Sequence, residues 1–164
     1  MKKLMEKVSI LSLSLILTTA FSISSAQSAM FAFYKGIPES WVELLVSLPS
    51  AGIMLMLLFN RVIEKYLTER QMIVSGLLIF SLCGLLPLLN QSYWLMFVSR
   101  LVFGMGIGLL NAKAISIVSE RYKGQERVRL LGLRGSAEVV GTALLTFGVS
   151  RLLPLGWQAA FLVY

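Results

Sequence analysis

The apolar stretch from Trp94 to Val118 constrains the fold of this chain more than any other feature. It matches a bilayer in length, because about 20 helical residues rising 1.5 Å each cross a hydrocarbon core of about 30 Å. Within the stretch only Arg100 and Lys113 are charged. A guanidinium that faces lipid costs roughly 3 to 10 kcal/mol, so an arginine at this depth is expected to face the interior of a helix bundle. Arg100 is therefore the first candidate functional residue.

The composition agrees with a membrane protein and excludes several classes of enzyme. Of the 164 residues, 57% are hydrophobic and 14% are charged, unlike the balance of a soluble domain. Histidine and aspartate are absent and Cys83 is the single cysteine, which excludes catalytic triads, thiolate clusters and most metal sites. We expect no enzymatic activity, no cofactor and no metal. The net charge of +7 does not predict a nucleic-acid partner, because the positive residues lie between apolar runs.

Apolar runs with few charges divide the chain into five expected membrane spans and the start of a sixth. The expected spans cover about 8–33, 41–60, 72–89, 94–118 and 135–153, and the sixth begins at 157. We therefore expect an all-α, polytopic α-helical membrane protein with one transmembrane domain over residues 1–164.

The positive residues favour an orientation in the plasma (cytoplasmic) membrane with the amino terminus in the cytoplasm. Cytoplasmic loops collect lysine and arginine. In this orientation the outer connections carry only Lys35 and Arg151. The inner segments carry eleven positive residues: Lys2, Lys3, Lys7, Arg61, Lys65, Arg70, Arg121, Lys123, Arg127, Arg129 and Arg134. Trp41, Trp94 and Trp157 fall at expected outer ends of spans, where amphipathic rings favour the interface.

Residues 1–28 have an alternative interpretation as a cleaved secretory signal peptide. Lys2 and Lys3, an apolar core over 8–21 and the small-residue string SSAQSA are typical of such a peptide. Cleavage near Ala29 would leave the remaining topology unchanged, so charge counting does not separate this alternative from a first span. The mass of the protein isolated from membranes distinguishes the two.

Several small and polar residues are candidates for a cavity lining or for helix packing. At about 100° per residue, Gly104, Gly108 and Asn111 share a helix face with Arg100. The glycines also let a neighbouring helix approach closely, and we expect the same packing role for Gly141. Four hydroxyl residues on one side of the first span are further cavity candidates: Ser14, Thr18, Ser22 and Ser25. Hydrogen bonds to the backbone of their own helix are the alternative use of these hydroxyls.

Three charged residues each have two interpretations. Glu138 is a candidate proton carrier, since burial favours the neutral form of a carboxyl group, but we favour an ion pair with Arg134 one turn earlier. For Lys113 we favour a side chain that extends along lipid and places its ammonium among the headgroups, rather than a cavity role. Arg100 is either a functional group or a structural cation paired with a backbone carbonyl, Glu43 or Glu138.

The stretch RLVFGMGIG from Arg100 to Gly108 resembles the major facilitator superfamily, whose fourth helix carries an arginine followed by spaced glycines. Other stretches match that family's amino-terminal half in order. They are LVSLPSAGI in the second span, the basic link to the third span, the link SERYKGQERVRLLGL, a glycine-rich fifth span and GWQAAFLVY. The resemblance covers essentially the whole chain, and bacterial drug-efflux-like members are the most similar in general appearance.

The link between the second and third spans departs from the family pattern. In the family this link is a cytoplasmic charge latch with a glycine, an acidic residue, a basic residue, a second glycine and a basic pair. Here the stretch NRVIEKYLTER keeps Glu64, Lys65 and Arg70, but Asn60 and Leu67 replace the glycines. The resemblance implies a latch role for the three charged residues. The alternative is that the basic residues only hold this loop inside.

The resemblance also implies a function. The family builds a transporter from two six-helix halves with the substrate site between them. Because the expected sixth span covers only about 12 Å, we expect a truncated or partial secondary transporter for a small-molecule substrate, working by proton-coupled efflux. Its expected partners are the lipid bilayer, the substrate, and a missing carboxy-terminal half or a partner membrane subunit. The alternative is a membrane-embedded interaction subunit, or an inactive remnant, with no transport of its own.

Overall fold

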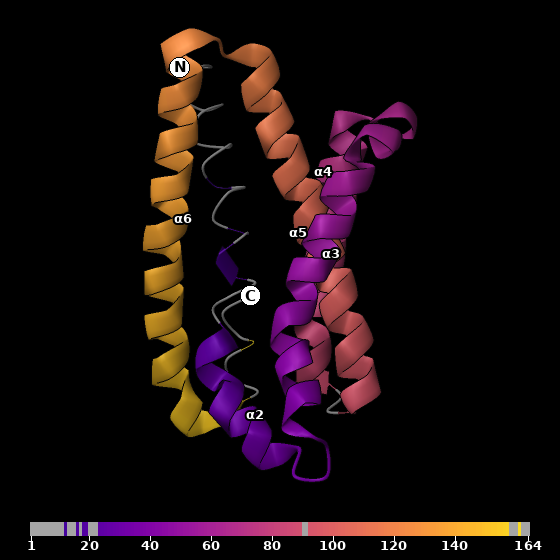
Figure 1. Ribbon diagram of the computed structural model, residues 1–164, viewed down its shortest axis with the longest axis vertical. Helices are drawn as coiled ribbons and strands as arrows, with labels where there is room; N and C mark the ends of the chain where they lie inside the picture. The colour runs from indigo at the N-terminus through magenta and orange to yellow at the C-terminus, as the bar shows by residue number, and fades with distance from the viewer. Residues whose placement is uncertain are drawn as a thin grey trace.

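A computed structural model describes residues 12, 16, 18–19, 23–89, 92–157 and 161, and every regular element in this part of the chain is helical. Four long helices dominate (Figure 1): α3 (Glu39–Tyr66), α4 (Glu69–Leu89), α5 (Tyr93–Arg121) and α6 (Gly124–Leu152). Three short elements complete the described part: η1 (Ile23–Ala26), α2 (Gln27–Phe33) and η2 (Leu153–Leu155).

The four long helices are each long and apolar enough to cross a bilayer, in agreement with the expected all-α membrane fold. They correspond to four of the five expected complete spans, and the described residues contain these four candidate spans. Parts of the expected first span, 8–33, lie outside the described residues, namely 8–11, 13–15, 17 and 20–22, and its end is seen as η1 and α2. The signal-peptide alternative falls largely in the same undescribed stretch.

Two local features explain where the helices begin. Thr68 and Gln71 form a capping box at the start of α4: the Thr68 N–H donates to Gln71 Oε1 over 2.9 Å, and the Gln71 N–H donates to Thr68 Oγ1 over 3.3 Å. α4 therefore starts ahead of its apolar run. α6 likewise starts at Gly124, well before its expected span, because the φ of +58° at this glycine permits a sharp turn after α5.

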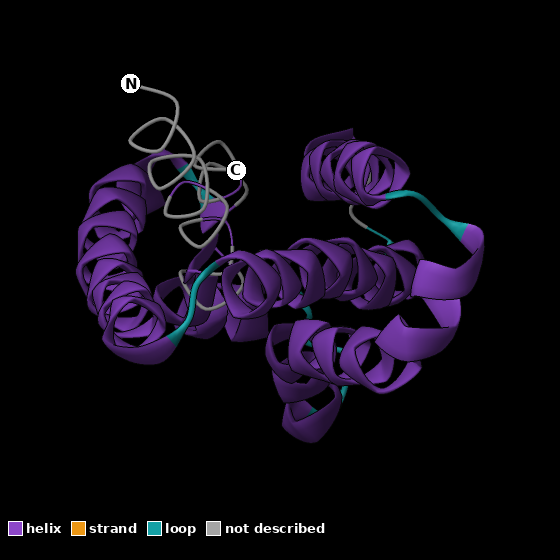
Figure 2. Ribbon diagram, turned by 90° about the horizontal axis from the view of Figure 1, so that it is seen from above, coloured by secondary structure: helices purple, strands orange, loops and turns teal. Residues whose placement is uncertain are grey.

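α5 is the helix against which α3 and α4 pack. Most residues in its apolar part are buried inside the protein, whereas in the other three long helices only a minority are buried, as expected of helices that contact lipid. Figure 2 looks down the bundle and shows the helices side by side. α6 stands on the other side of the molecule (Figure 1), and among the described elements it contacts η1 and, at few positions, α5.

Two glycines of α5 permit the close approach of α3. Gly104 lies directly against the backbone of Pro49. At Gly108 an added Cβ would lie 2.7 Å from the Cβ of Met56. Carbon atoms in contact are normally about 3.5–4.0 Å apart, so a side chain at either position would push the helices apart. Gly104 and Gly108, two of the three glycines expected to assist packing, therefore lie in the contact between α3 and α5.

The approach of α4 depends on another pair of glycines. An added Cβ at Gly106 would lie 2.9 Å from Ile79 Cγ2, and one at Gly76 would lie 2.8 Å from Leu110 Cγ. Because Gly106 alternates with Gly104 and Gly108 along α5, α3 covers one face of α5 and α4 covers another.

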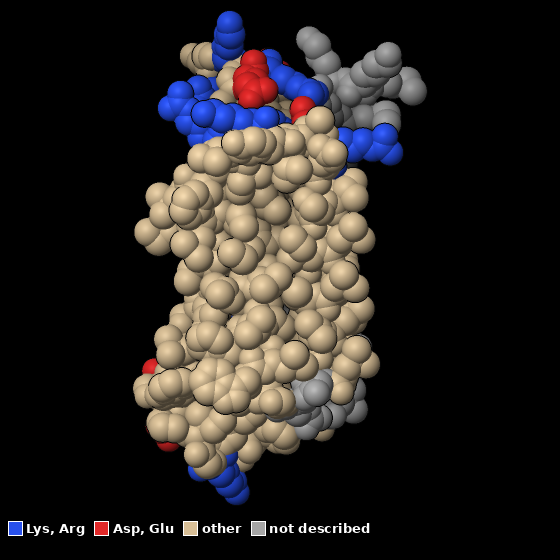
Figure 3. Space-filling model, turned by 90° about the vertical axis from the view of Figure 1, so that its right-hand side faces the viewer, with Lys and Arg blue, Asp and Glu red and all other residues tan. Residues whose placement is uncertain are grey.

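Positive side chains gather at the end of the bundle where α3 and α5 stop and α4 and α6 start. We call this the basic end, and it carries Arg61, Lys65, Arg70, Arg121, Lys123, Arg127 and Arg129. Figure 3 shows lysine and arginine side chains at one end of the face in view, above a broad band of uncharged residues. The band is the part of the surface suited to hydrocarbon.

We expect Gly104→Ala to destabilise the protein by about 1–3 kcal/mol. The new methyl group meets the Pro49 backbone, which cannot move aside by rotation as a side chain can. Gly132→Ala is the matched control. An added Cβ there meets no atom within 4 Å, so helix propensity should raise stability by up to about 1 kcal/mol. Thermal unfolding in detergent, followed by tryptophan fluorescence, measures both variants. Equal stability of the two would contradict the packing described here.

Candidate functional site

Arg100 lies on α5, roughly 10 Å along the helix from Tyr93, and is only 2% exposed. Its guanidinium carbon Cζ is 4.3 Å from the centre of the Phe161 ring and 5.3 Å from the centre of the Phe103 ring. A desolvated cation over a ring face gains about 2 kcal/mol. The two ring faces thus offset part of the cost of burying this charge.

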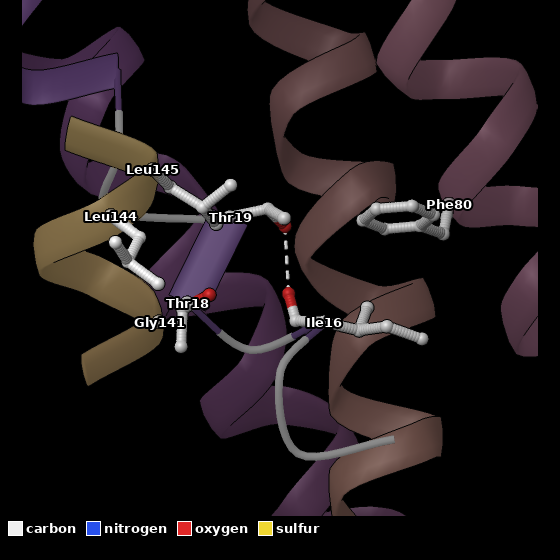
Figure 4. Close-up of a pocket in the computed structure, with 7 residues that line it drawn as sticks. All are labelled: Ile16, Thr18, Thr19, Phe80, Gly141, Leu144 and Leu145. Carbon is white, nitrogen blue, oxygen red and sulfur yellow. Dashed lines mark hydrogen bonds between the residues drawn. The ribbon is translucent and has the colours of Figure 1, made fainter. Parts of the chain in front are cut away.

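An aromatic contact joins Arg100 to a cavity. The Phe103 ring stacks on Phe80 of α4, with centroids 5.1 Å apart and planes 26° apart. Phe80 lines a cavity of about 340 Å³. The other lining residues come from the start of the chain and from α6 (Figure 4): Ile16, Thr18, Thr19, Gly141, Leu144 and Leu145. The cavity therefore lies between three segments that are far apart in the sequence.

The cavity wall is apolar apart from two threonines. Thr18 is 2% exposed and Thr19 is 7% exposed. The Thr19 hydroxyl donates to the carbonyl oxygen of Ile16 over 2.7 Å (Figure 4), the bond within the same segment that such hydroxyls commonly make. Small-molecule sites usually enclose about 300–1,000 Å³ behind mainly apolar walls. This cavity is at the small end of that range and suits a small, mainly apolar solute.

The structure gathers some of the predicted cavity residues and separates others. Thr18 and Gly141 both line the cavity, so Gly141 lies at a cavity wall. Ser25 is half-buried in η1 and is not part of that wall. Ser14 and Ser22 lie outside the described residues.

Sequence reasoning missed the aromatic residues of the site. Phe80 and Phe161 contact the cavity and Arg100 respectively. A phenylalanine in an apolar run has no polar atom that marks an inward position. The spacing of residues within one helix also carries no information on which ring of another helix it meets.

The expected polar face of α5 is divided between two neighbours. Gly104 and Gly108 are covered by α3, whereas Asn111 Oδ1 accepts a hydrogen bond from Arg134 Nη2 of α6. Arg134 also pairs with Glu138, with 3.1 Å between nitrogen and oxygen. Because Arg134 is only 6% exposed, these three polar residues form a largely buried link between α5 and α6.

The link from Asn111 to Arg134 and Glu138 bears on the two interpretations of Glu138, as an ion-pair partner and as a proton carrier. Glu138 pairs with Arg134, which is the interpretation favoured from the sequence. Its carboxylate is therefore engaged one turn away on α6 rather than with Arg100. A proton-carrying role for Glu138 stays a prediction.

The lipid-facing interpretation of Lys113 is wrong. Its side chain is buried, at 7% exposure, and Nζ lies 3.6 Å from Glu64 Oε1 of α3. The distance is that of an ion pair slightly longer than a hydrogen bond. Lys113 turns away from lipid because α3 covers this side of α5 and supplies the carboxylate.

The expected latch residues do not form one cluster. Lys65 and Arg70 are exposed, and within the described residues no ion pair joins either of them to Glu64. α4 is instead linked to α5 by Glu69 and Arg121, 3.3 Å apart. Both partners are about half exposed, so this pair contributes only about 0–1 kcal/mol.

The end opposite the basic end carries an aromatic cluster. Trp41 and Trp94 are exposed and their rings lie 6.2 Å apart, as suits an interface. Trp157 differs from the expectation for an interface residue, because it is buried against Tyr34 with ring centroids 5.9 Å apart. Burial, together with the neighbouring Tyr93, raises the pKa of Tyr34. This phenol therefore stays neutral near neutral pH.

We expect Arg134→Leu to be more destabilising than the double variant Arg134→Leu/Glu138→Leu. The single variant leaves a carboxylate without its cation, which costs up to about 3–5 kcal/mol in a buried pair and less here, where Glu138 is 28% exposed. Arg127→Leu, at an exposed position of the same helix, should change stability by less than about 0.5 kcal/mol. Thermal unfolding in detergent compares the three. A double variant less stable than Arg134→Leu would show that the pair does not compensate charge.

The family model described as the Major Facilitator Superfamily matches residues 6–164. Comparisons with curated proteins and with solved structures gave no match. The matched region includes all four long helices, Arg100 and the cavity. This chain therefore belongs to the Major Facilitator Superfamily, a family of multi-pass membrane transporters.

Proposed function

We propose that this chain forms the amino-terminal half of a secondary transporter that moves a small, mainly apolar solute out of the cell by proton-coupled efflux. The observation that carries the proposal is the burial of Arg100 between Phe103 and Phe161, one ring stack away from an apolar cavity. In this family the substrate site lies between the two halves of the transporter.

A positive charge at this depth is costly, so an arginine that is kept there is expected to have a role. The aromatic rings recover only part of the lost hydration of Arg100. A polar group of the substrate, or of the other half of the transporter, would change the free energy of this buried charge when it approaches. The free energy of Arg100 therefore depends on which groups face it. A substrate that contacts Arg100 in one conformation of the transporter and not in the other would shift the equilibrium between the two conformations.

Glu138 is the proposed proton carrier. Its carboxylate holds Arg134, which in turn donates to Asn111 of α5. Protonation would remove the charge that pairs with Arg134 and would weaken the link between α5 and α6. Gly141, on the next turn of α6, lines the cavity. Proton binding at Glu138 would thus change the shape of the cavity at Gly141, because one turn of α6 joins the two residues.

The proposed orientation places the basic end in the cytoplasm. Positive side chains gather at that end of the described helices (Figure 3), and lysine and arginine accumulate on the cytoplasmic side of membrane proteins. The plasma membrane is the proposed location, with the amino terminus in the cytoplasm.

We expect Arg100→Ala to abolish transport without reducing the amount of protein in the membrane, because it removes the charge but leaves the apolar surface of α5. Arg100→Lys keeps a cation near the rings and should retain part of the activity. The assay, on the complete transporter with both halves, is proton-driven uptake of a neutral apolar dye into inside-out membrane vesicles, with Arg127→Ala as the control for loss of an exposed charge. Wild-type uptake by Arg100→Ala would remove this residue from the site.

We expect Glu138→Gln to lose proton-driven transport while it retains downhill movement of the solute, because the amide mimics the protonated carboxyl group and cannot release a proton. Uptake of the neutral dye in the presence and absence of a protonophore measures the first property. Efflux from preloaded vesicles without a proton gradient measures the second. Proton-driven uptake by this variant at the wild-type rate would exclude Glu138 as the carrier.

The alternative function is that of a membrane-embedded interaction subunit. It predicts no dye transport by any variant and co-purification with another membrane protein at a fixed stoichiometry. Affinity purification from native membranes followed by mass spectrometry separates the two functions.

A further inference from the structure

Two adjoining hollows lie along α4 at the basic end, away from the cavity near Arg100. One has a volume of about 410 Å³, and the other has a volume of about 330 Å³. Arg70 and Val74 line both hollows, so the two form one continuous surface around this pair of residues. Leu78 extends the first hollow, and Arg121 of α5 closes the second.

This surface changes from charged to apolar along α4. Arg70 lies in the first turn of the helix, next to the basic end. Val74 and Leu78 follow one and two turns later on the same face and are 46% and 57% exposed. Arg70 and Leu78 are about 12 Å apart along the helix axis. The surface therefore runs from a cationic head toward the apolar band of the bundle.

The cationic part of the surface has an excess of positive charge. Arg121 pairs with Glu69 at 3.3 Å, whereas among the described residues no carboxylate forms an ion pair with Arg70. Two arginines thus face one glutamate among the residues that line the second hollow. The positive end of the α4 dipole lies at the same place and adds to the potential.

We propose that this surface binds one anionic phospholipid, with its phosphate between Arg70 and Arg121 and one acyl chain along Val74 and Leu78. A ligand with a charged head and an apolar chain matches both parts of the surface. A free phosphate ion would leave the apolar part uncovered, and a lipid without net charge would leave the excess positive charge uncompensated. Anionic lipids concentrate in the cytoplasmic leaflet, where basic pockets between helices bind their headgroups.

A lipid in this position would bridge α4 and α5. It would lie beside the ion pair of Glu69 with Arg121, which is the described charge contact between these two helices at the basic end. The lipid would therefore hold the basic end of α4 against α5 more firmly than this exposed pair does alone.

The test is a binding titration of the purified full chain in detergent, followed by native mass spectrometry. The two probes are dioleoylphosphatidylglycerol and dioleoylphosphatidylcholine, which share acyl chains and differ in headgroup charge. We expect tighter binding of the phosphatidylglycerol. Arg70→Gln should weaken that binding about fivefold, since one arginine near an anionic surface contributes about 1 kcal/mol, and should leave phosphatidylcholine binding unchanged.

Two further variants make the test specific. Arg127→Gln removes one exposed charge from the same end but from α6, and it should bind phosphatidylglycerol like the wild type. Leu78→Asn, at the apolar part of the surface, should weaken the binding of both lipids. Equal losses in Arg70→Gln and Arg127→Gln would overturn the site in favour of general charge attraction. Displacement of the lipid by an equal concentration of glycerol 3-phosphate would overturn it in favour of a simple anion site.

Discussion

The contact between α5 and α3 at Gly104 is the constraint on which the rest of the described structure depends. Lipid is as apolar as leucine, so burial of apolar surface does not drive helices together in a membrane, and close van der Waals packing has to do so. Gly104 provides that packing because its missing side chain lets the Pro49 backbone touch α5. Gly106 provides the same for α4 on another face. α5 is therefore enclosed on two sides, and its polar residues must find partners within protein.

The partners of those polar residues come from different helices. Lys113 meets Glu64 of α3, and Asn111 meets Arg134 of α6. Arg100 instead lies over Phe103 and Phe161. Two of the three contacts are polar and stabilise the bundle directly. The third places a buried cation against two ring faces, and the role of Arg100 in transport stays a proposal.

Features that depend on neighbours in the sequence could be predicted. The pair of Arg134 with Glu138 spans one helical turn, so residue spacing was enough to favour it. Contacts between helices could not be predicted in this way. Lys113 was expected to extend into lipid, and only the position of α3 shows that it is buried beside a carboxylate. Phe80 joins the site because it stacks on Phe103 and lines the cavity, and no periodicity within α4 marks that role.

The sequence by itself determined that the long apolar segments are helices and that positive charge collects at one end. The physical reason is that a backbone in hydrocarbon must satisfy its hydrogen bonds within the segment, whereas charged loops must stay in water. Only the tertiary structure decided which face of α5 meets which neighbour. Gly104, Gly106 and Gly108 allow close approach on more than one face, and the partner chosen at each face depends on side chains brought together from distant parts of the chain.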